Sequence, residues 1–262
     1  MRARPQVRAR MIATDRGGSG TFYPRREDTE LLAGAASRCD GRSVLEIGVG
    51  SGAVAVAAAR AGARWVVATD LNPGALRAAR ELARCSGVHV EVLRTDLARG
   101  LGRFERVLAN PPYLPTRRGQ RDPDRWVNLA LDGGRDGCRT LARLLASLPS
   151  HLVAGGRAYV VLSSLQDPAR IARLRASWRR AGGGVRVAGR RRLQGEVLTL
   201  WELRGPGRPS RAARRSGRRA RGTPARRRIP GASRRGSSRE PAPGRTIAPG
   251  GASDRRRSRR GS

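Results

Sequence analysis

The chain has 262 residues and a formal net charge of +35, and all 55 of its basic residues are Arg. No stretch approaches the roughly 20 apolar residues that a membrane span needs, and the three cysteines are too few and too widely spaced for a disulfide framework or a CxxC motif. The two histidines, His89 and His151, are too far apart to suggest a zinc site. We therefore expect a cytoplasmic protein that binds no metal and no membrane.

The composition changes sharply at Arg204. From there to Ser262 the chain holds 20 Arg and two acidic residues, so this segment carries +18 and leaves +17 (35 − 18) for residues 1–203. So few apolar residues cannot offset the entropy lost on folding. We predict a flexible N-terminal segment at 1–19, a folded domain at 20–203 and a disordered Arg-rich tail at 204–262. The tail is interpreted either as a contact for RNA or the ribosome or as passive compositional drift.

Strands and helices are expected to alternate along the folded domain. The predicted strands are 43–47, 65–69, 88–93, 106–109, 157–163, 185–187 and 197–203, and the predicted helices are 53–61, 73–85, 141–152 and 168–180. A polar loop is expected at 116–135. This order predicts an α/β fold with a doubly wound, mostly parallel sheet, whose ligands gather at the carboxyl ends of the strands.

A glycine turn follows the first predicted strand. Gly48, Gly50 and Gly52 lead from this strand into a helix, a unit that binds nucleotide-like cofactors. The run also fits the dinucleotide fingerprint, so alone it does not identify the cofactor. Glu46 favours S-adenosylmethionine, because a carboxylate here would repel a pyrophosphate but can hold the ammonium group of the methionine portion.

Two further carboxylates are expected at the same edge of the sheet. Asp70 ends the second predicted strand, where it can accept hydrogen bonds from both ribose hydroxyls of either cofactor. Asp96 follows the third strand and is placed to accept from the exocyclic amine of adenine, with the backbone of Leu97 alongside. Each could instead be an ordinary turn or helix-capping residue.

The fourth predicted strand ends in Asn110, Pro111, Pro112 and Tyr113. The Asn110 side-chain oxygen and the Pro111 carbonyl can each accept one N–H of a planar nitrogen, which aligns that nitrogen with a methyl donor. Two prolines stiffen the turn, and Tyr113 offers an aromatic face to a flat substrate group. The sequence therefore predicts methyl transfer to an amide or an exocyclic amine.

Four stretches together resemble the HemK family of glutamine methyltransferases, in its short branch without the N-terminal helical domain. They are Tyr23 with Glu27-Asp28-Thr29, then 46–52, 110–113 and 133–137. The glycine turn is generic to class I methyltransferases, and the Asn-Pro-Pro-Tyr run also occurs in some DNA and RNA amino-methyltransferases. The first and last stretches are more selective. The resemblance spans about residues 20–203.

The resemblance implies a Rossmann-like class I methyltransferase that modifies the side-chain amide of glutamine in the Gly-Gly-Gln motif of peptide-chain release factors. It also implies a small activating subunit in some members. By this likeness the cofactor would be S-adenosylmethionine, and its contacts would be Thr29, Glu46, Gly48, Asp70, Asp96, Leu97 and Asn110. The substrate glutamine would meet residues 110–113. The alternative is a methyltransferase acting on an exocyclic amine of RNA or DNA.

Overall fold

The computed structural model describes residues 13–14, 21–22 and 25–205. Its centre is a seven-stranded sheet with the order β5-β4-β3-β6-β7-β9-β8. The strands are β3 (Ser43–Ile47), β4 (Trp65–Asp70), β5 (Glu91–Arg94), β6 (Phe104–Ala109), β7 (Leu152–Ser163), β8 (Gly184–Leu193) and β9 (Glu196–Arg204). β3 to β7 pair in parallel, whereas β9 is antiparallel to both β7 and β8. The predicted mostly parallel sheet is confirmed.

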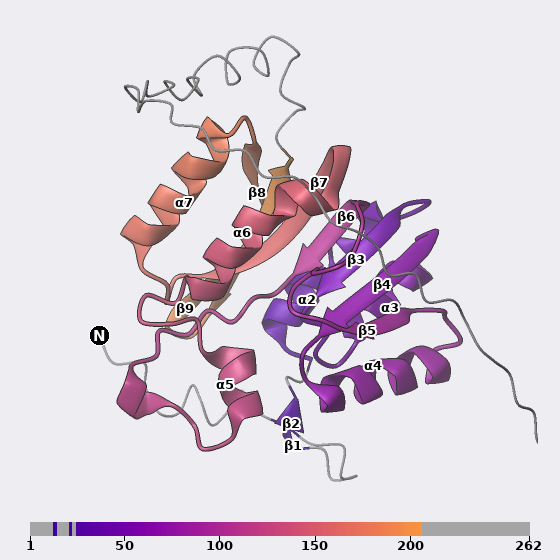
Figure 1. Cartoon of the computed structure of the whole chain (residues 1–262), viewed down its shortest axis with the longest axis horizontal. Helices are drawn as coiled ribbons and strands as arrows, with labels where there is room; N and C mark the ends of the chain where they lie inside the picture. The colour runs from indigo at the N-terminus through magenta and orange to yellow at the C-terminus, as the bar shows by residue number, and fades with distance from the viewer. Residues whose placement is uncertain (1–12, 15–20, 23–24, 206–262) are drawn as a thin grey trace, which may run out of the picture. The chain divides into compact units, whose positions relative to one another are not determined.

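Helices cover both faces of this sheet (Figure 1). They are α2 (Glu27–Ala33), α3 (Ala53–Arg60), α4 (Pro73–Cys85), α5 (Arg125–Leu131), α6 (Arg139–His151) and α7 (Pro168–Arg180), with short 3-10 helices at Ala36–Arg38 and Arg118–Gln120. Side chains of α2, α3 and α4 share one hydrophobic cluster with one face, and those of α6 and α7 share a second cluster with the other. This two-sided packing is the doubly wound arrangement that the sequence predicts.

Local chemistry explains why two helices have the predicted bounds. α4 and α7 both start with proline, whose fixed φ suits a first helical turn. The preceding residue caps each one: the side chain of Asn72 accepts from Gly74 N, and that of Asp167 accepts from Arg170 N. Trp178 of α7 is buried in the second cluster, as its place on the apolar face of that helix predicts.

One prediction about local structure is wrong. The expected polar loop at 116–135 contains α5, which Asp124 caps by accepting from Trp126 N. Val127 and Leu131, four residues apart, are its buried face, and this helical spacing outweighs the polar composition around it. Before Ser43, where the sequence indicates no particular element, the structure contains α2, which buries Leu32 completely.

The ends of the chain lie largely outside the described residues. Within the N-terminal segment, Ala13–Thr14 (β1) pairs antiparallel with Thr21–Phe22 (β2). β9 ends at Arg204, and the Arg-rich tail from Pro206 onward is not among the described residues.

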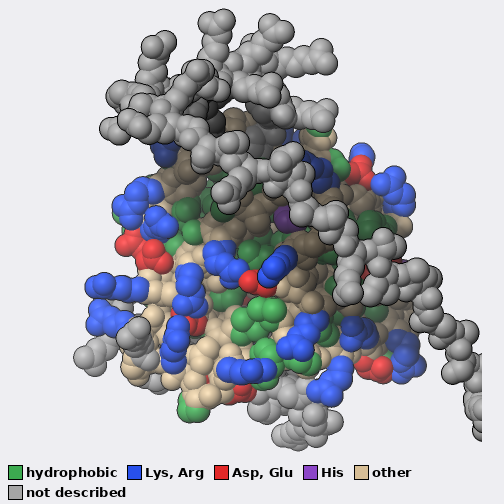
Figure 2. Space-filling view, in the orientation of Figure 1, with side chains coloured by type: hydrophobic (Ala, Val, Ile, Leu, Met, Phe, Trp, Pro, Cys, Tyr) green, Lys and Arg blue, Asp and Glu red, His purple; other side chains and the backbone are tan. Residues whose placement is uncertain are grey.

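None of the described helices is long and apolar enough to cross a membrane. In the same ranges no group of His, Cys, Asp and Glu could hold a metal ion. Figure 2 shows arginines outnumbering acidic side chains over the visible face.

Candidate active site

A pocket opens at the carboxyl ends of β3, β4 and β6, where ligands of a parallel sheet are expected. It collects nearly all the residues that the sequence singles out. The predicted residues in its lining are Thr29, Glu46, Gly48, Gly50, Asp70, Asp96, Leu97, Asn110, Pro111, Pro112 and Tyr113. Gly52 lies just behind this lining. Its φ is +84°, and a Cβ there would come within 2.7 Å of the Ala79 Cα in α4, so only glycine lets the turn pack against this helix.

Glu46 is buried, and one of its two carboxylate oxygens lacks a hydrogen-bond donor among the described residues. Its side chain is 3% exposed, and its Oε2 atom has no hydrogen-bond partner among the described residues. Burial raises the pKa of Glu46 well above its usual value; the N–H of Ala55 opposes this shift and the charge of Asp70 adds to it. A cationic hydrogen-bond donor in the pocket would satisfy this oxygen and favour the ionised carboxylate.

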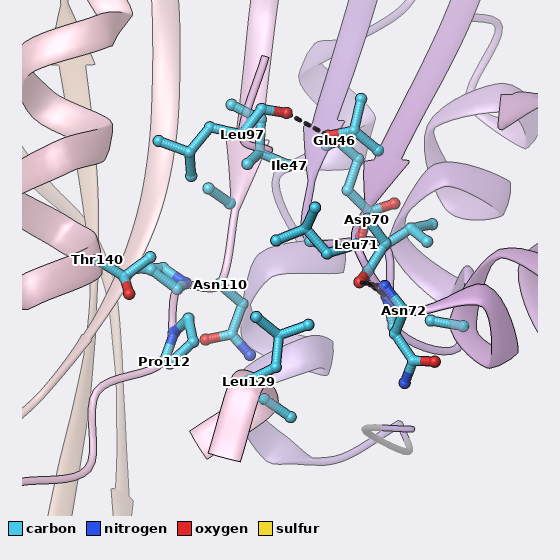
Figure 3. Close-up of a pocket in the computed structure, with 18 of the residues that line it drawn as sticks. Glu46, Ile47, Asp70, Leu71, Asn72, Leu97, Asn110, Pro112, Leu129 and Thr140 are labelled. Carbon is cyan, nitrogen blue, oxygen red and sulfur yellow. Dashed lines mark hydrogen bonds between the residues drawn. The ribbon is translucent and has the colours of Figure 1, made fainter. Parts of the chain in front are cut away.

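Asp70 joins the glycine turn to the start of α4. Its Oδ2 accepts from Gly50 N at 3.2 Å, and its Oδ1 accepts from Asn72 N at 2.8 Å. Burial raises the pKa of Asp70, although these N–H groups lower it in part. The carboxylate therefore has a structural task in this turn and also lines the pocket between β4 and α4, as Figure 3 shows.

Asp96 and Leu97 form the side of the pocket beyond β5. Leu97 has a φ of +53°, the only positive value among the non-glycine residues that the structure describes, and its carbonyl accepts from the Thr69 hydroxyl at 2.7 Å. Asp96 accepts from Arg143 Nη2 of α6 at 2.6 Å. The predicted acceptor is thus already paired with a guanidinium from α6, a contact that sequence spacing does not reveal.

Asn110 follows β6 directly and points into the cavity between Pro112 and Leu129 (Figure 3). Its Oδ1 atom is buried and, like Glu46 Oε2, has no hydrogen-bond partner within the described part of the chain. An acceptor that is shielded from water and left unpaired costs about 1–3 kcal/mol. The pocket therefore contains two unsatisfied oxygens that a ligand with N–H groups can satisfy.

Tyr113 is held from the far side of the pocket by α2. Its hydroxyl donates to Asp28 Oδ2 at 3.1 Å, and the same carboxylate accepts from Thr29 N at 2.7 Å. Both Asp28 and Tyr113 are buried. The sequence stretch around Thr29 is therefore connected to the Asn-Pro-Pro-Tyr run through Asp28, a residue for which no separate role was predicted.

The glycine-rich stretch at 133–137 supports the Asn-Pro-Pro-Tyr run from behind. Thr116 N donates to Gly134 O at 2.8 Å, and Gly133 N donates to Leu114 O at 2.9 Å. Gly137 has a φ of +72°, and a Cβ on it would meet Tyr113 O at 2.5 Å. This close backbone approach requires glycine.

Some pocket residues were not predicted. Trp126 and Leu129 of α5, and Thr140 and Arg143 of α6, line the cavity. Figure 3 shows Leu129 beside Asn110 and Thr140 on the other side. The helical spacing of Val127 and Leu131 was the available signal for α5, but no sequence pattern places that helix at the pocket.

Comparison with known proteins agrees with this geometry. The Methyltransferase small domain family matches residues 21–124. A chain from Methanocaldococcus jannaschii, named as a candidate protein N5-glutamine methyltransferase, is 39% identical over 144 residues, which is 55% of this chain and 73% of the relative. The mouse methyltransferase HEMK2 is 35% identical over 168 residues, 60% of this chain and 78% of the relative. The chain belongs to the HemK family of glutamine methyltransferases.

A solved structure of a methylating complex has a similar fold. In the Mtq2–Trm112 complex of E. cuniculi, described as methylating the translation termination factor eRF1, the similar chain is 26% identical. The match covers 70% of this chain and 98% of that one, with a TM-score of 0.54. The protein described here is accordingly a methyltransferase with a Rossmann-like fold. Of its HemK-like stretches, 27–29, 46–52 and 110–113 contribute residues to one pocket, and 133–137 packs behind the Asn-Pro-Pro-Tyr run. Tyr23 lies outside the described residues.

Proposed function

We propose that this methyltransferase uses S-adenosylmethionine to methylate the side-chain amide nitrogen of a glutamine in a protein such as a peptide-chain release factor. The observation that carries the proposal is the pair of unsatisfied buried acceptors, Glu46 Oε2 and Asn110 Oδ1, in one pocket. The first suits a cation, and the second suits a neutral N–H donor. A cofactor with an ammonium group and an amide substrate together supply these two donors.

The pocket residues fit the cofactor in chemical type. Glu46 would hold its ammonium group, Asp70 its ribose hydroxyls, and Asp96 with the Leu97 backbone its adenine. Thr29 of α2 also lines the pocket and would complete the set of contacts. Bound S-adenosylmethionine supplies an electrophilic methyl carbon, so the protein needs neither a metal nor a nucleophile of its own.

On the acceptor side, the protein positions a weak nucleophile. An amide nitrogen attacks poorly because its lone pair is conjugated with the carbonyl. Asn110 Oδ1 and the Pro111 carbonyl would each accept one N–H, which fixes the direction of the lone pair and favours a more tetrahedral nitrogen. Tyr113, held by Asp28, keeps this run in place, so little reorganisation is needed at the moment of transfer.

The identity of the acceptor rests on family membership more than on the pocket. The same two oxygens could receive an exocyclic amine of a nucleobase. Glutamine is favoured because the M. jannaschii relative is named for N5-glutamine and the E. cuniculi relative is described as acting on a termination factor. The E. cuniculi protein was solved with Trm112, so an added small activating subunit belongs in the assay.

The test is transfer of labelled methyl from S-adenosylmethionine to a release factor, compared with the same factor carrying Gln→Asn in its Gly-Gly-Gln motif. We expect label on the unaltered factor alone, and none with Asn110→Ala, although calorimetry shows retained cofactor binding. Turnover by Asn110→Ala would contradict the acceptor assignment. In an extract from cells lacking the gene, label that nuclease removes and protease does not would support the nucleic-acid alternative.

A further inference from the structure

A row of arginines crosses the sheet at the edge opposite the pocket. Arg106 of β6 lies directly across from Arg157 of β7, and Arg157 lies directly across from Arg204 of β9. Residues paired in this way project from the same face of a sheet, with neighbouring strands about 4.8 Å apart. Like charges in opposite positions destabilise a sheet, so this row is unfavourable unless something neutralises it.

The described acidic side chains near the row are too few to neutralise it. Glu202 of β9, 3% exposed, accepts from Arg157 and Arg186 and from Arg38 Nη1 at 3.2 Å. Burial alone would raise the pKa of Glu202, but the guanidinium groups of Arg186 and Arg157 outweigh it and lower the pKa. One carboxylate therefore serves three arginines, which remain 41%, 42% and 59% exposed at Arg38, Arg157 and Arg186.

Arg106 and Arg204 have no carboxylate partner in the ranges that the structure describes. Arg106 donates to the backbone carbonyls of Arg38 and Glu105, at 3.0 and 2.9 Å. The nearby carboxylate of Glu105 is taken by Arg42 and Arg64. Arg204 is exposed, and its side chain extends over Gly184 in the next strand.

We propose that these five arginines, Arg38, Arg106, Arg157, Arg186 and Arg204, bind the phosphodiester backbone of a nucleic acid. They are called the arginine row below. Their guanidinium groups match the planar, bidentate geometry of phosphate oxygens. Their positions are fixed by the sheet register, by Glu202 and by the stacking of Arg38 over the Tyr159 ring at 5.6 Å. Prearranged cations lose little side-chain entropy on binding.

The surroundings favour a nucleic acid over a membrane. Among the described residues, the large exposed apolar side chains are Trp65, Leu93 and Val187. Trp65 stacks on Phe104 and Val187 pairs with Trp201, and both of these partners belong to the cluster under α6 and α7. Arg157 precedes Ala158 of that cluster, so the arginine row projects from the opposite face of the sheet. Leu93 follows Val92 of the cluster on the face of the row, so Leu93 also points away from the row. A charged face without apolar anchors suits a polyanion in water.

The arginine row leaves the pocket accessible. Arg106 is near the start of β6, whereas Asn110 follows its end, about 13 Å away along an extended strand. A nucleic acid on the row could therefore be held while a protein substrate occupies the pocket. This inference goes beyond the proposed methyl transfer and does not depend on it.

The test compares two double variants of the full-length protein that lose the same charge. Arg186→Gln with Arg204→Gln alters the row but leaves Arg38 and Arg157 on Glu202. Arg173→Gln with Arg175→Gln alters α7, which packs through Trp178 on the opposite face of the sheet. Because both proteins keep the Arg-rich C-terminal residues, any binding by those residues is common to both. Fluorescence anisotropy would report binding to a short labelled single-stranded RNA and to a DNA duplex, across a series of salt concentrations.

The logarithm of the affinity falls linearly with the logarithm of the salt concentration. For single-stranded RNA, loss of two phosphate contacts should make this slope shallower by about 1.4 and lower the affinity about 25-fold at 0.1 M salt. The α7 variant should keep the unaltered slope. Equal slopes in the two variants, or loss of binding to anionic vesicles with nucleic-acid binding intact, would overturn the proposal. Arg204→Gln alone, which breaks no described ion pair, should give about half the change in slope and guards against a folding defect. Methyl transfer to the protein substrate should be unchanged in all three variants.

Discussion

Replacing Glu46 by Gln tests whether cofactor binding needs a negative charge at this position in the pocket. Glutamine keeps the shape and one acceptor oxygen but cannot carry the negative charge that would face the cofactor ammonium. A hydrogen bond between charged partners contributes about 1.5–3 kcal/mol, so the change should raise the Kd for S-adenosylmethionine about 10- to 150-fold. The side chain is 3% exposed, so bulk water does little to screen this interaction.

The same variant has an opposite effect on the protein without cofactor. The pKa of Glu46 in the folded chain is raised above the ordinary value of 4.5, so the folded state holds the proton more tightly than the unfolded state. The stability this provides is complete at low pH and is lost as pH rises from about 4.5 through the raised pKa. A glutamine at this position does not titrate, so the Glu46→Gln variant should lose less stability over this window. Asp70, whose pKa is also raised, leaves a residual slope.

Calorimetry with S-adenosylmethionine at several pH values measures both effects alongside urea unfolding. In the unaltered protein, cofactor affinity should rise with pH through the same window, because the bound ammonium favours the ionised carboxylate. Glu81→Gln, an exposed carboxylate on α4, is the charge-matched control and should leave Kd unchanged. A Glu46→Gln protein that binds as tightly as the control, with the same pH dependence as the unaltered chain, would refute this account of Glu46.

Three more substitutions separate cofactor binding from positioning. Asp70→Asn should weaken cofactor binding about tenfold or more by calorimetry, through loss of a charged acceptor, and an unchanged Kd would contradict its ribose role. Gly137→Ala should lower the free energy of unfolding by more than Gly155→Ala, because both glycines have positive φ but only the first meets Tyr113 O at 2.5 Å. Equal losses in urea unfolding would show that the contact is unimportant. Tyr113→Phe removes the bond to Asp28 and should cost about 1 kcal/mol of stability and lower kcat, with the cofactor Kd retained.

The sequence predicts the bounds of an element best where signals from a few neighbouring residues agree. β3, α4 and α7 have the predicted bounds because apolar runs, prolines and capping residues act over a few positions. The parallel order then brings Glu46, Asp70 and Asn110 to one edge, as general rules for α/β sheets imply. Prediction fails for α5, whose buried face of two residues is too short to stand out from a polar segment.

Long-range contacts were beyond prediction for a different reason. Asp28 reaches Tyr113 across 85 residues, and Arg143 reaches Asp96 across 47. Such pairs depend on how α2 and α6 pack on the sheet, which no short pattern encodes. The alignment of Arg106, Arg157 and Arg204 likewise appears only once the strand register is known.

The two edges of the sheet thus have opposite electrostatic character. At the carboxyl edge, Glu46 and Asn110 each have an oxygen without a donor among the described residues, and burial keeps Glu46 sensitive to the charge of its ligand. At the amino edge, the five arginines of the arginine row have Glu202 as their one carboxylate partner in the described part of the chain, which leaves an excess of four positive charges. The proposed sulfonium cofactor and the proposed polyanion would therefore each be drawn to a different edge, and the sheet between them would keep the two charges from neutralising each other. Binding at one edge should then leave affinity at the other unchanged, which titrating RNA against a cofactor-saturated protein would measure directly.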